Sequence, residues 1–283
     1  MKTAFLVCFA LIAGMTARAD FSYTTTRKSG PGGEGATKNY YKGQKMMTDS
    51  GDTSMILDFD AQTMTNVNKS QKTYTVAKFS DLNLGAAKEA LAETKIDVKE
   101  TGQRKTINGF DARELMMTMD VDSARAGMKM QMEMSMWISS DVPGKGEMRA
   151  FYQRNAERFP WTAAAGQSNP QMQKGMADLM RKMMSMDGVT VLQIVKMKGA
   201  AGDPKAAQMQ AQMEQMRAKM EEMQKQGGAQ AAAAQQMMAR MGGLGGGSGS
   251  MFEMQMESSN FSTSSIPEST FAIPAGFQKV DRK

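Results

Sequence analysis

The stretch from Met128 to Met136 constrains the fold more than any other part of this chain. Five methionines occupy every second position, and the positions between them hold Lys129, Gln131, Glu133 and Ser135. Successive side chains of a β-strand point to opposite faces, so this alternation predicts a strand with one apolar and one polar face. Such a strand belongs in an antiparallel sheet with one buried and one solvated side.

Residues 1–19 have the pattern of an export signal. Lys2 precedes an uncharged apolar run, and Ala17-Arg18-Ala19 predicts cleavage between Ala19 and Asp20. The apolar run of about ten residues is too short to cross a bilayer, which needs roughly 20. We therefore expect a periplasmic or secreted protein without a transmembrane segment in its mature chain.

The missing residue types exclude several kinds of chemistry. The chain has no histidine and one cysteine, Cys8, which lies in the predicted leader. The mature chain therefore has no imidazole base, no thiolate nucleophile and no Cys/His zinc site. The acidic pairs with i,i+2 spacing, Asp58 with Asp60 and Asp120 with Asp122, lie at the ends of predicted strands, where aspartate usually caps a turn. We predict no enzymatic activity, no catalytic residue, no metal site and no cofactor.

The charge does not favour nucleic acid as a partner. Removal of the leader takes away Lys2 and Arg18 and lowers the formal net charge from +6 to +4. The remaining lysines and arginines are scattered instead of clustered, whereas nucleic-acid binding proteins gather them on one face.

Local patterns predict strands alternating with a few helices. Strands are expected at 21–27, 40–47, 54–59, 63–67, 72–77, 96–100, 105–107, 112–121, 128–138, 189–197 and 251–256. Helices are expected at 79–94 and 146–159, with a third after Asn169-Pro170 that carries methionines at three- and four-residue steps.

Residues 199–250 break the pattern and read as an insertion, partly helical and partly disordered. Asp203 and Pro204 are typical of a helix start. One stripe follows, made of Met209, Met213, Met216, Met220 and Met223, and the segment ends in a Gly-rich linker. We expect residues 189–197 to pair with 251–260 as a hairpin that carries this insertion at its tip. Residues 20–198 and 251–283 then form a single β domain.

Three stretches of the sequence resemble a known family. They are Gln71-Lys72-Thr73-Tyr74 after a strand-turn-strand beginning at Lys42-Gly43-Gln44-Lys45, Trp137-Ile138-Ser139-Ser140-Asp141, and the C-terminal run from Phe271 to Val280. Together they resemble a bacterial envelope domain family of unknown function, which is similar to the LolA and LppX type of periplasmic lipid and lipoprotein carriers. The resemblance implies a strongly curved antiparallel sheet, a half-barrel, with helices on its concave side and acyl chains between them. Fold similarity does not by itself transfer function.

The 33 methionines of the chain allow three interpretations. The stripes are ordinary core, or they line an adaptable apolar groove, because methionine is flexible and re-packs around varied ligands. Alternatively, their thioethers bind Cu(I), for which soft sulfur is suited. Exposure of the methionine sulfurs to solvent in the folded protein distinguishes the Cu(I) interpretation from the core and groove interpretations.

The sequence thus predicts an α+β fold, a curved antiparallel half-barrel with helices on the concave side plus the Met-rich helical insertion. We expect a non-enzymatic envelope protein that binds a lipid, an acyl chain or an amphipathic partner, with Cu(I) binding and a structural or assembly role as alternatives. The candidate ligand-binding residues are Met128, Met130, Met132, Met134, Met136 and Trp137. The stripe from Met209 to Met223 is the candidate site for an envelope protein partner.

Overall fold

The structure is a computed structural model. It describes residues 20–29, 33–82, 96–123, 128–155, 187–200, 202–205 and 252–281, with single or paired positions between 207 and 250. The predicted leader, the predicted third helix and the five methionines of the insertion stripe lie outside the described residues.

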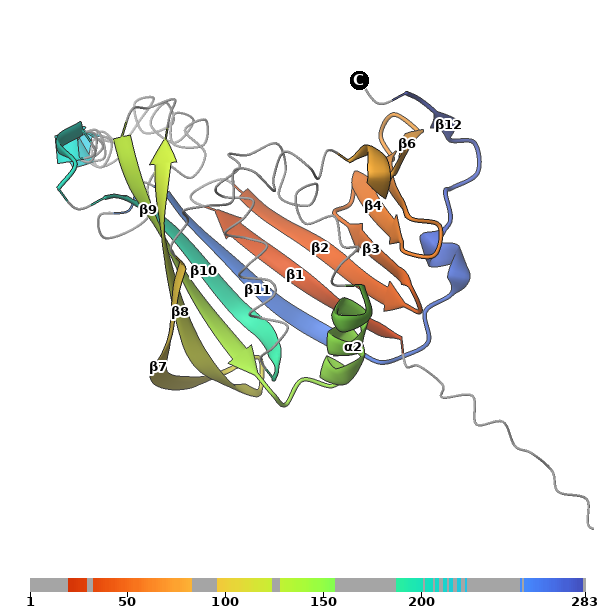
Figure 1. Cartoon of the computed structure of the whole chain (residues 1–283), viewed down its shortest axis with the longest axis horizontal. Helices are drawn as coiled ribbons and strands as arrows, with labels where there is room; N and C mark the ends of the chain where they lie inside the picture. The colour runs from red at the N-terminus through yellow and green to blue at the C-terminus, as the bar shows by residue number, and fades with distance from the viewer. Residues whose placement is uncertain are drawn as a thin grey trace, which may run out of the picture.

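Twelve strands of the described residues form one sheet (Figure 1). They are β1 (Phe21–Ser29), β2 (Gly33–Lys42), β3 (Lys45–Asp49), β4 (Thr53–Asp58), β5 (Thr63–Asn68), β6 (Thr73–Lys78), β7 (Ile96–Ile107), β8 (Phe110–Ser123), β9 (Met128–Ser139), β10 (Val189–Gly199), β11 (Phe252–Ser262) and β12 (Gln278–Lys279). Their order across the sheet is β12-β6-β5-β4-β3-β2-β1-β11-β10-β9-β8-β7. Two antiparallel meanders, β1–β6 and β7–β11, therefore meet where β1 pairs with β11.

The predicted α+β half-barrel with helices along its concave side is wrong. The described residues form a large mixed sheet, because β12 pairs in parallel with β6, and apart from the start of the insertion helix after Asp203 their one α-helix is the short α2 (Lys145–Asn155), with 11 residues. The segment predicted as a helix at 79–94 begins with only one 3-10 turn, η2 (Phe79–Asp81), and residues 83–95 lie outside the described part. Most of the described chain lies in long consecutive hairpins, whose backbone hydrogen bonds are made between strands. Few described residues are therefore helical.

The predicted meander at residues 54–77 is confirmed as β4, β5 and β6. Polar side chains close its turns: the Asp58 carboxylate accepts hydrogen bonds from the backbone N–H groups of Asp60 and Ala61, at 3.0 and 2.9 Å. One other prediction needs correction. The strand predicted at 40–47 is divided between β2 and β3 by a turn at Gly43, whose φ is +57°.

An apolar row crosses the first meander and is covered by α2. Paired residues place six side chains on one face of the sheet: Phe21, Tyr41, Met46, Leu57, Met64 and Ala77. Figure 1 shows α2 across this end of the sheet, and the Phe151 ring meets those of Tyr41 and Phe59 edge to face, with centroids 5.2 and 5.5 Å apart. The hydroxyls of Tyr23 and Tyr152 lie 3.5 and 3.0 Å from that of Tyr41, and burial raises the pKa of Tyr41 well above its ordinary value.

The C-terminal segment covers the opposite face of the same meander. Ile266 and Phe271 pack there with Met47, Ile56 and Val67. The buried Asp20 carboxylate fastens this segment, because its Oδ2 accepts hydrogen bonds from the Ile266 N–H at 2.6 Å and from Lys42 Nζ at 3.0 Å. The first and last parts of the described chain are thereby held together.

The predicted hairpin of residues 189–197 with 251–260 is confirmed, since β10 and β11 pair in antiparallel from Leu192↔Glu257 to Met197↔Phe252. Asp203 begins a helix as predicted: its Oδ1 accepts a hydrogen bond from the Lys205 N–H at 2.9 Å. Its Oδ2 also accepts one from the Lys129 N–H at 2.7 Å. The start of the insertion is thus attached to β9.

The turn before β10 supplies a stability prediction. Gly188 has a φ of +131°, and a Cβ at this position would lie 2.6 Å from the carbonyl oxygen of Ser139. We expect Gly188→Ala to lower the free energy of unfolding by about 2 kcal/mol or more, because overpacking adds to backbone strain. Gly109→Ala is the control: Gly109 also has a positive φ, +84°, but has no atom within 4 Å of a built Cβ. Urea unfolding should show a smaller loss for the control, and equal losses would contradict the steric argument.

Candidate functional site

The alternation predicted for β9 is confirmed. Met132, Met134 and Met136 are 5%, 1% and 0% exposed, whereas Lys129 is exposed and Gln131, Glu133 and Ser135 are partly exposed. Met130 is partly buried, and the side chain of Met128 lies outside the described residues. The strand thus presents its methionines to the inside of the molecule.

The register of the sheet extends this stripe over four strands. Side chains of paired residues lie on the same face, and pairing builds three rows from β8 to β11. The rows are Met117–Met134–Val195–Met254, then Met119–Met132–Met197, then Leu115–Met136–Gln193–Met256. We call the apolar members of these rows the methionine face. They form one buried cluster with partly buried residues at its margin.

Five methionines of this face, Met197 of β10 among them, were not predicted as site residues. Met117, Met119, Met254 and Met256 carry the same i,i+2 signal as β9, but in shorter runs. In β8 the adjacent Met116 interrupts the alternation, because it points to the opposite face. Only strand pairing shows that the three runs belong to one surface.

Trp137 does not belong to the methionine face. It follows Met136 directly, so its side chain points to the other side of β9, where it pairs with Glu114 and Leu192. Its ring is buried, and Lys105 Nζ lies 3.9 Å from the ring centroid, in position for a cation–π contact. The six predicted ligand-binding residues are therefore divided between two faces.

Glu114, on the face of Trp137, is a buried carboxylate whose oxygens are both used. Ser135 Oγ donates to Oε1 at 2.5 Å and Thr101 Oγ1 donates to Oε2 at 2.8 Å. A buried charge requires such partners. This arrangement holds β7, β8 and β9 together.

Arg27 stands at the border of the methionine face. It pairs with Met256 on one side and with Gly35 on the other, so it continues the third row. Its guanidinium lies 3.8 Å from the position that a Cβ of Gly35 would occupy, so the glycine leaves room for the side chain over β2. Arg27 is exposed and forms no ion pair within the described part of the chain.

By strand pairing, the methionine face and the aromatic row under α2 continue across β1 on the same side, while Trp137 also packs into the aromatic cluster. On β1, Phe21, Tyr23, Thr25 and Arg27 alternate with residues of the other side, and the β1–β2 register runs without a shift. Between the two apolar regions lies a polar strip, in which Asn39 Nδ2 donates to Thr25 Oγ1 at 3.2 Å. The polar strip therefore separates the methionine face from the aromatic residues under α2.

Two kinds of feature are absent from the described residues. No helix among them is both long and apolar enough to span a bilayer. In the same part of the chain, no group of three or more His, Cys, Asp or Glu side chains could hold a metal ion. This finding does not cover the thioether sulfurs of methionine.

Comparisons with known proteins do not identify the chain. No protein family matches the sequence, and no curated protein does. A solved structure of PNGF-II matches with a TM-score of 0.24 and 10% identity, over 44% of this chain and 21% of that one. This chain thus spans about a fifth of that protein, and a likeness of this size carries no argument about fold or function. The resemblance to the lipid-carrier family stays a prediction.

Burial of the methionine face leads to a stability prediction. We expect Met132→Asp to destabilise the protein by several kcal/mol, because its carboxylate would be buried without a partner. Lys129→Ala, on the exposed face of the same strand, should cost less than about 0.5 kcal/mol. Chemical denaturation followed by circular dichroism measures both. Similar losses from the two changes would contradict the assignment of the faces.

Proposed function

We propose that this protein is a non-enzymatic binder of an amphiphile, whose apolar chain lies on the methionine face and whose anionic head contacts Arg27. The observation that carries the proposal is the set of three methionine-rich rows over β8–β11, which ends at an exposed cation without an ion partner in the described residues. Following the predicted cleavage after Ala19, the protein would act in the envelope or outside the cell.

The choice of methionine supports an adaptable surface. Its side chain is unbranched and has three rotatable bonds, so several methionines can change rotamer together and admit a chain of variable shape. The face is filled in this structure, with Met134 and Met136 almost fully buried. Binding would therefore require the methionines to move aside, which costs little for residues with so many rotamers and would cost more for branched ones.

Arg27 suits the head group because of its position and its lack of a partner. A guanidinium forms two parallel hydrogen bonds with a carboxylate or a phosphate. Gln193 lies in the same row, and its Nε2 is 3.0 Å from the sulfur of Met134. The amide of Gln193 thus brings a polar group into the methionine face, in the row that continues to Arg27.

The geometry favours this function over Cu(I) binding and over catalysis. A copper site needs sulfurs that an ion can reach, whereas the central sulfurs of this face are buried. Among the acidic pairs considered from the sequence, Asp58 caps a turn, and Asp120 is exposed and accepts a hydrogen bond from Gln131 at 3.2 Å. Neither position is suited to acid–base chemistry, which needs a positioned carboxylate in a site that holds the substrate.

A fluorescent fatty acid tests the head-group contact. We expect saturable binding that weakens by about fivefold in Arg27→Gln, as expected for loss of a contact of about 1 kcal/mol. Lys28→Gln is the matched control, because Lys28 is the next residue, is also exposed and points to the opposite face. Competition by a fatty alcohol should not depend on Arg27. Equal effects of the two substitutions would argue against the site.

Replacement of sulfur separates the lipid and copper alternatives. In the triple variant Met117→Leu, Met132→Leu and Met134→Leu, the face stays apolar but loses three thioethers. We expect the variant to keep fatty-acid binding, with each added methylene of the ligand contributing up to about 0.8 kcal/mol. Stoichiometric Cu(I) uptake by the parent that is lost in the variant, without fatty-acid binding by either protein, would overturn the proposal.

A further inference from the structure

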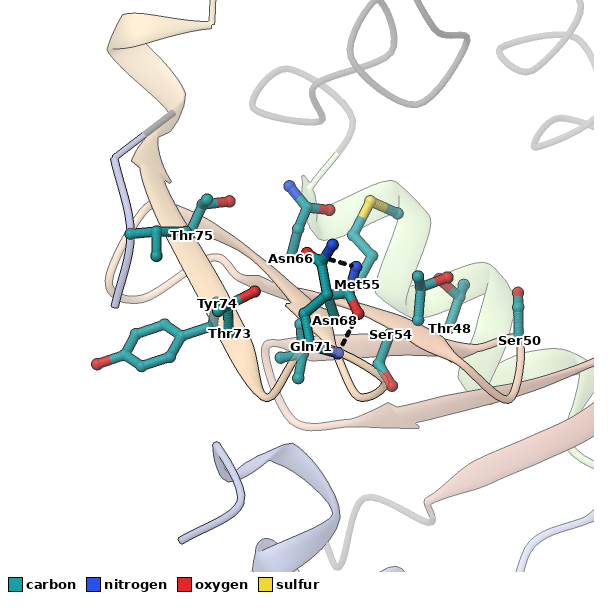
Figure 2. Close-up of a pocket in the computed structure, with 13 residues that line it drawn as sticks. Thr48, Ser50, Ser54, Met55, Asn66, Asn68, Gln71, Thr73, Tyr74 and Thr75 are labelled. Carbon is teal, nitrogen blue, oxygen red and sulfur yellow. Dashed lines mark hydrogen bonds between the residues drawn. The ribbon is translucent and has the colours of Figure 1, made fainter. Parts of the chain in front are cut away.

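A second site lies away from the methionine face, at the tips of the hairpins that connect β3 to β6. It is an open basin with a volume of 480 Å³, within the range of about 300–1,000 Å³ that is usual for small-molecule sites. Figure 2 shows its lining, with Asn66 and Met55 on one side of the strands and the ring of Tyr74 directed away from them.

Strand pairing places seven of the thirteen lining side chains in two rows on the α2 side of the sheet, whereas Ser54, Val67 and Tyr74 form a row on the opposite face. One row is Thr48–Met55–Asn66–Thr75, and the other is Thr53–Asn68–Thr73. Neighbouring strands are about 4.8 Å apart, so the rows present a hydroxyl or an amide at almost every strand. One apolar side chain, Met55, stands among them.

The lining is mostly polar, with Met55, Val67, Tyr74 and Val280 as its less polar members, and it carries no charged side chain. Hydroxyls and amides both donate and accept hydrogen bonds. Charged groups beside the basin already have partners within the protein. Lys69 Nζ lies 2.6 Å from Asp49 Oδ1, and Asp52 accepts a hydrogen bond from Ser70 at 3.2 Å. The basin therefore offers no net charge to attract an anion or a cation.

Several of these groups have unused hydrogen-bonding capacity. Asn68 and Gln71 bond to each other, and Ser50 bonds to Thr37 at 3.0 Å. In contrast, the side chains of Thr48, Asn66, Thr73 and Thr75 form no hydrogen bond with another described residue. Asn66 is exposed, and the three threonines are partly exposed. A ligand can thus bond to them without breaking contacts within the protein.

We propose that this basin binds a neutral, polyhydroxylated ligand, such as a sugar unit of a glycan. A sugar hydroxyl matches groups that donate and accept at once, and the C–H face of a sugar ring can pack on the Met55 side chain. The absence of cationic and anionic groups from the lining disfavours phosphates and metal ions, and the density of polar groups disfavours an acyl chain. The site is independent of the proposed amphiphile site.

Saturation-transfer NMR with neutral sugars tests the proposal on the full mature chain. The probes are glucose, galactose, mannose, N-acetylglucosamine and their β-linked disaccharides, with glucuronate as a charged analogue of glucose. We expect at least one neutral probe to bind. Asn66→Ala and Thr75→Val should each weaken its binding by about fivefold, which corresponds to one hydrogen bond.

Thr106→Val is the matched control, because Thr106 is an exposed strand threonine on β7, outside the basin. It should leave sugar binding unchanged, and thermal melting should show all three variants folded. Absence of binding by every neutral probe would overturn the proposal, as would preferential binding of glucuronate or equal effects of Thr75→Val and Thr106→Val. None of these outcomes depends on fatty-acid binding.

Discussion

The pairing of β1 with β11 is the interaction on which the rest of the sheet depends. It joins residues from opposite ends of the described chain, Thr26 with Glu257 for example, and makes one sheet of two meanders. A bulge interrupts the register between Ser22 and Thr24, and Asn260, on the opposing strand, has a φ of +53°. Contacts so distant in sequence require closure of a large loop, whose entropy the interface must offset. Without this pairing, Arg27 would not continue the row of Met256.

One side of the joined sheet combines three chemically different regions. The methionine face lies on β8–β11, aromatic residues lie under α2, and the uncharged basin lies on β3–β6. A single register determines all three, because each row runs perpendicular to the strands. A shift of β1 by one residue would place Lys28 where Arg27 now stands and would turn Phe21 outward. The separate sites therefore depend on the same hydrogen-bonded ladder.

The sequence predicted the strands well and the architecture poorly. Alternation identified β9, the meander β4–β6 and the β10–β11 hairpin, because a period of two is a local signal. It did not reveal that β1 pairs with β11, because pairing between distant strands leaves no periodic trace. The helix expected at 79–94 is tested only at its start: apolar residues at Leu82, Ala86 and Ala90 fit a helical spacing, the described start is one 3-10 turn, and residues 83–95 lie outside the described part. For the candidate site, residue spacing marked Met132, Met134 and Met136 correctly as one surface. It placed Trp137 with them wrongly, because the strand continues past the stripe. The basin carried no signal, since scattered threonines and asparagines acquire meaning only when strands align them.

The two edges of the sheet are protected by different means. At one edge the short β12 covers β6. At the other, β7 leaves one side of a 12-residue strand unpaired in the described chain, and an open edge of this length invites another molecule to add a strand. Its composition opposes such growth: Lys99, Glu100, Arg104 and Lys105 line the strand, and the register shifts between Glu100 and Arg104, next to Gly102 with a φ of +78°. An incoming strand would meet a break in the ladder and a row of solvated charges. The strand whose Lys105 lies over Trp137 thus carries, in its charges and its register shift, features that oppose strand addition at the open edge of the sheet.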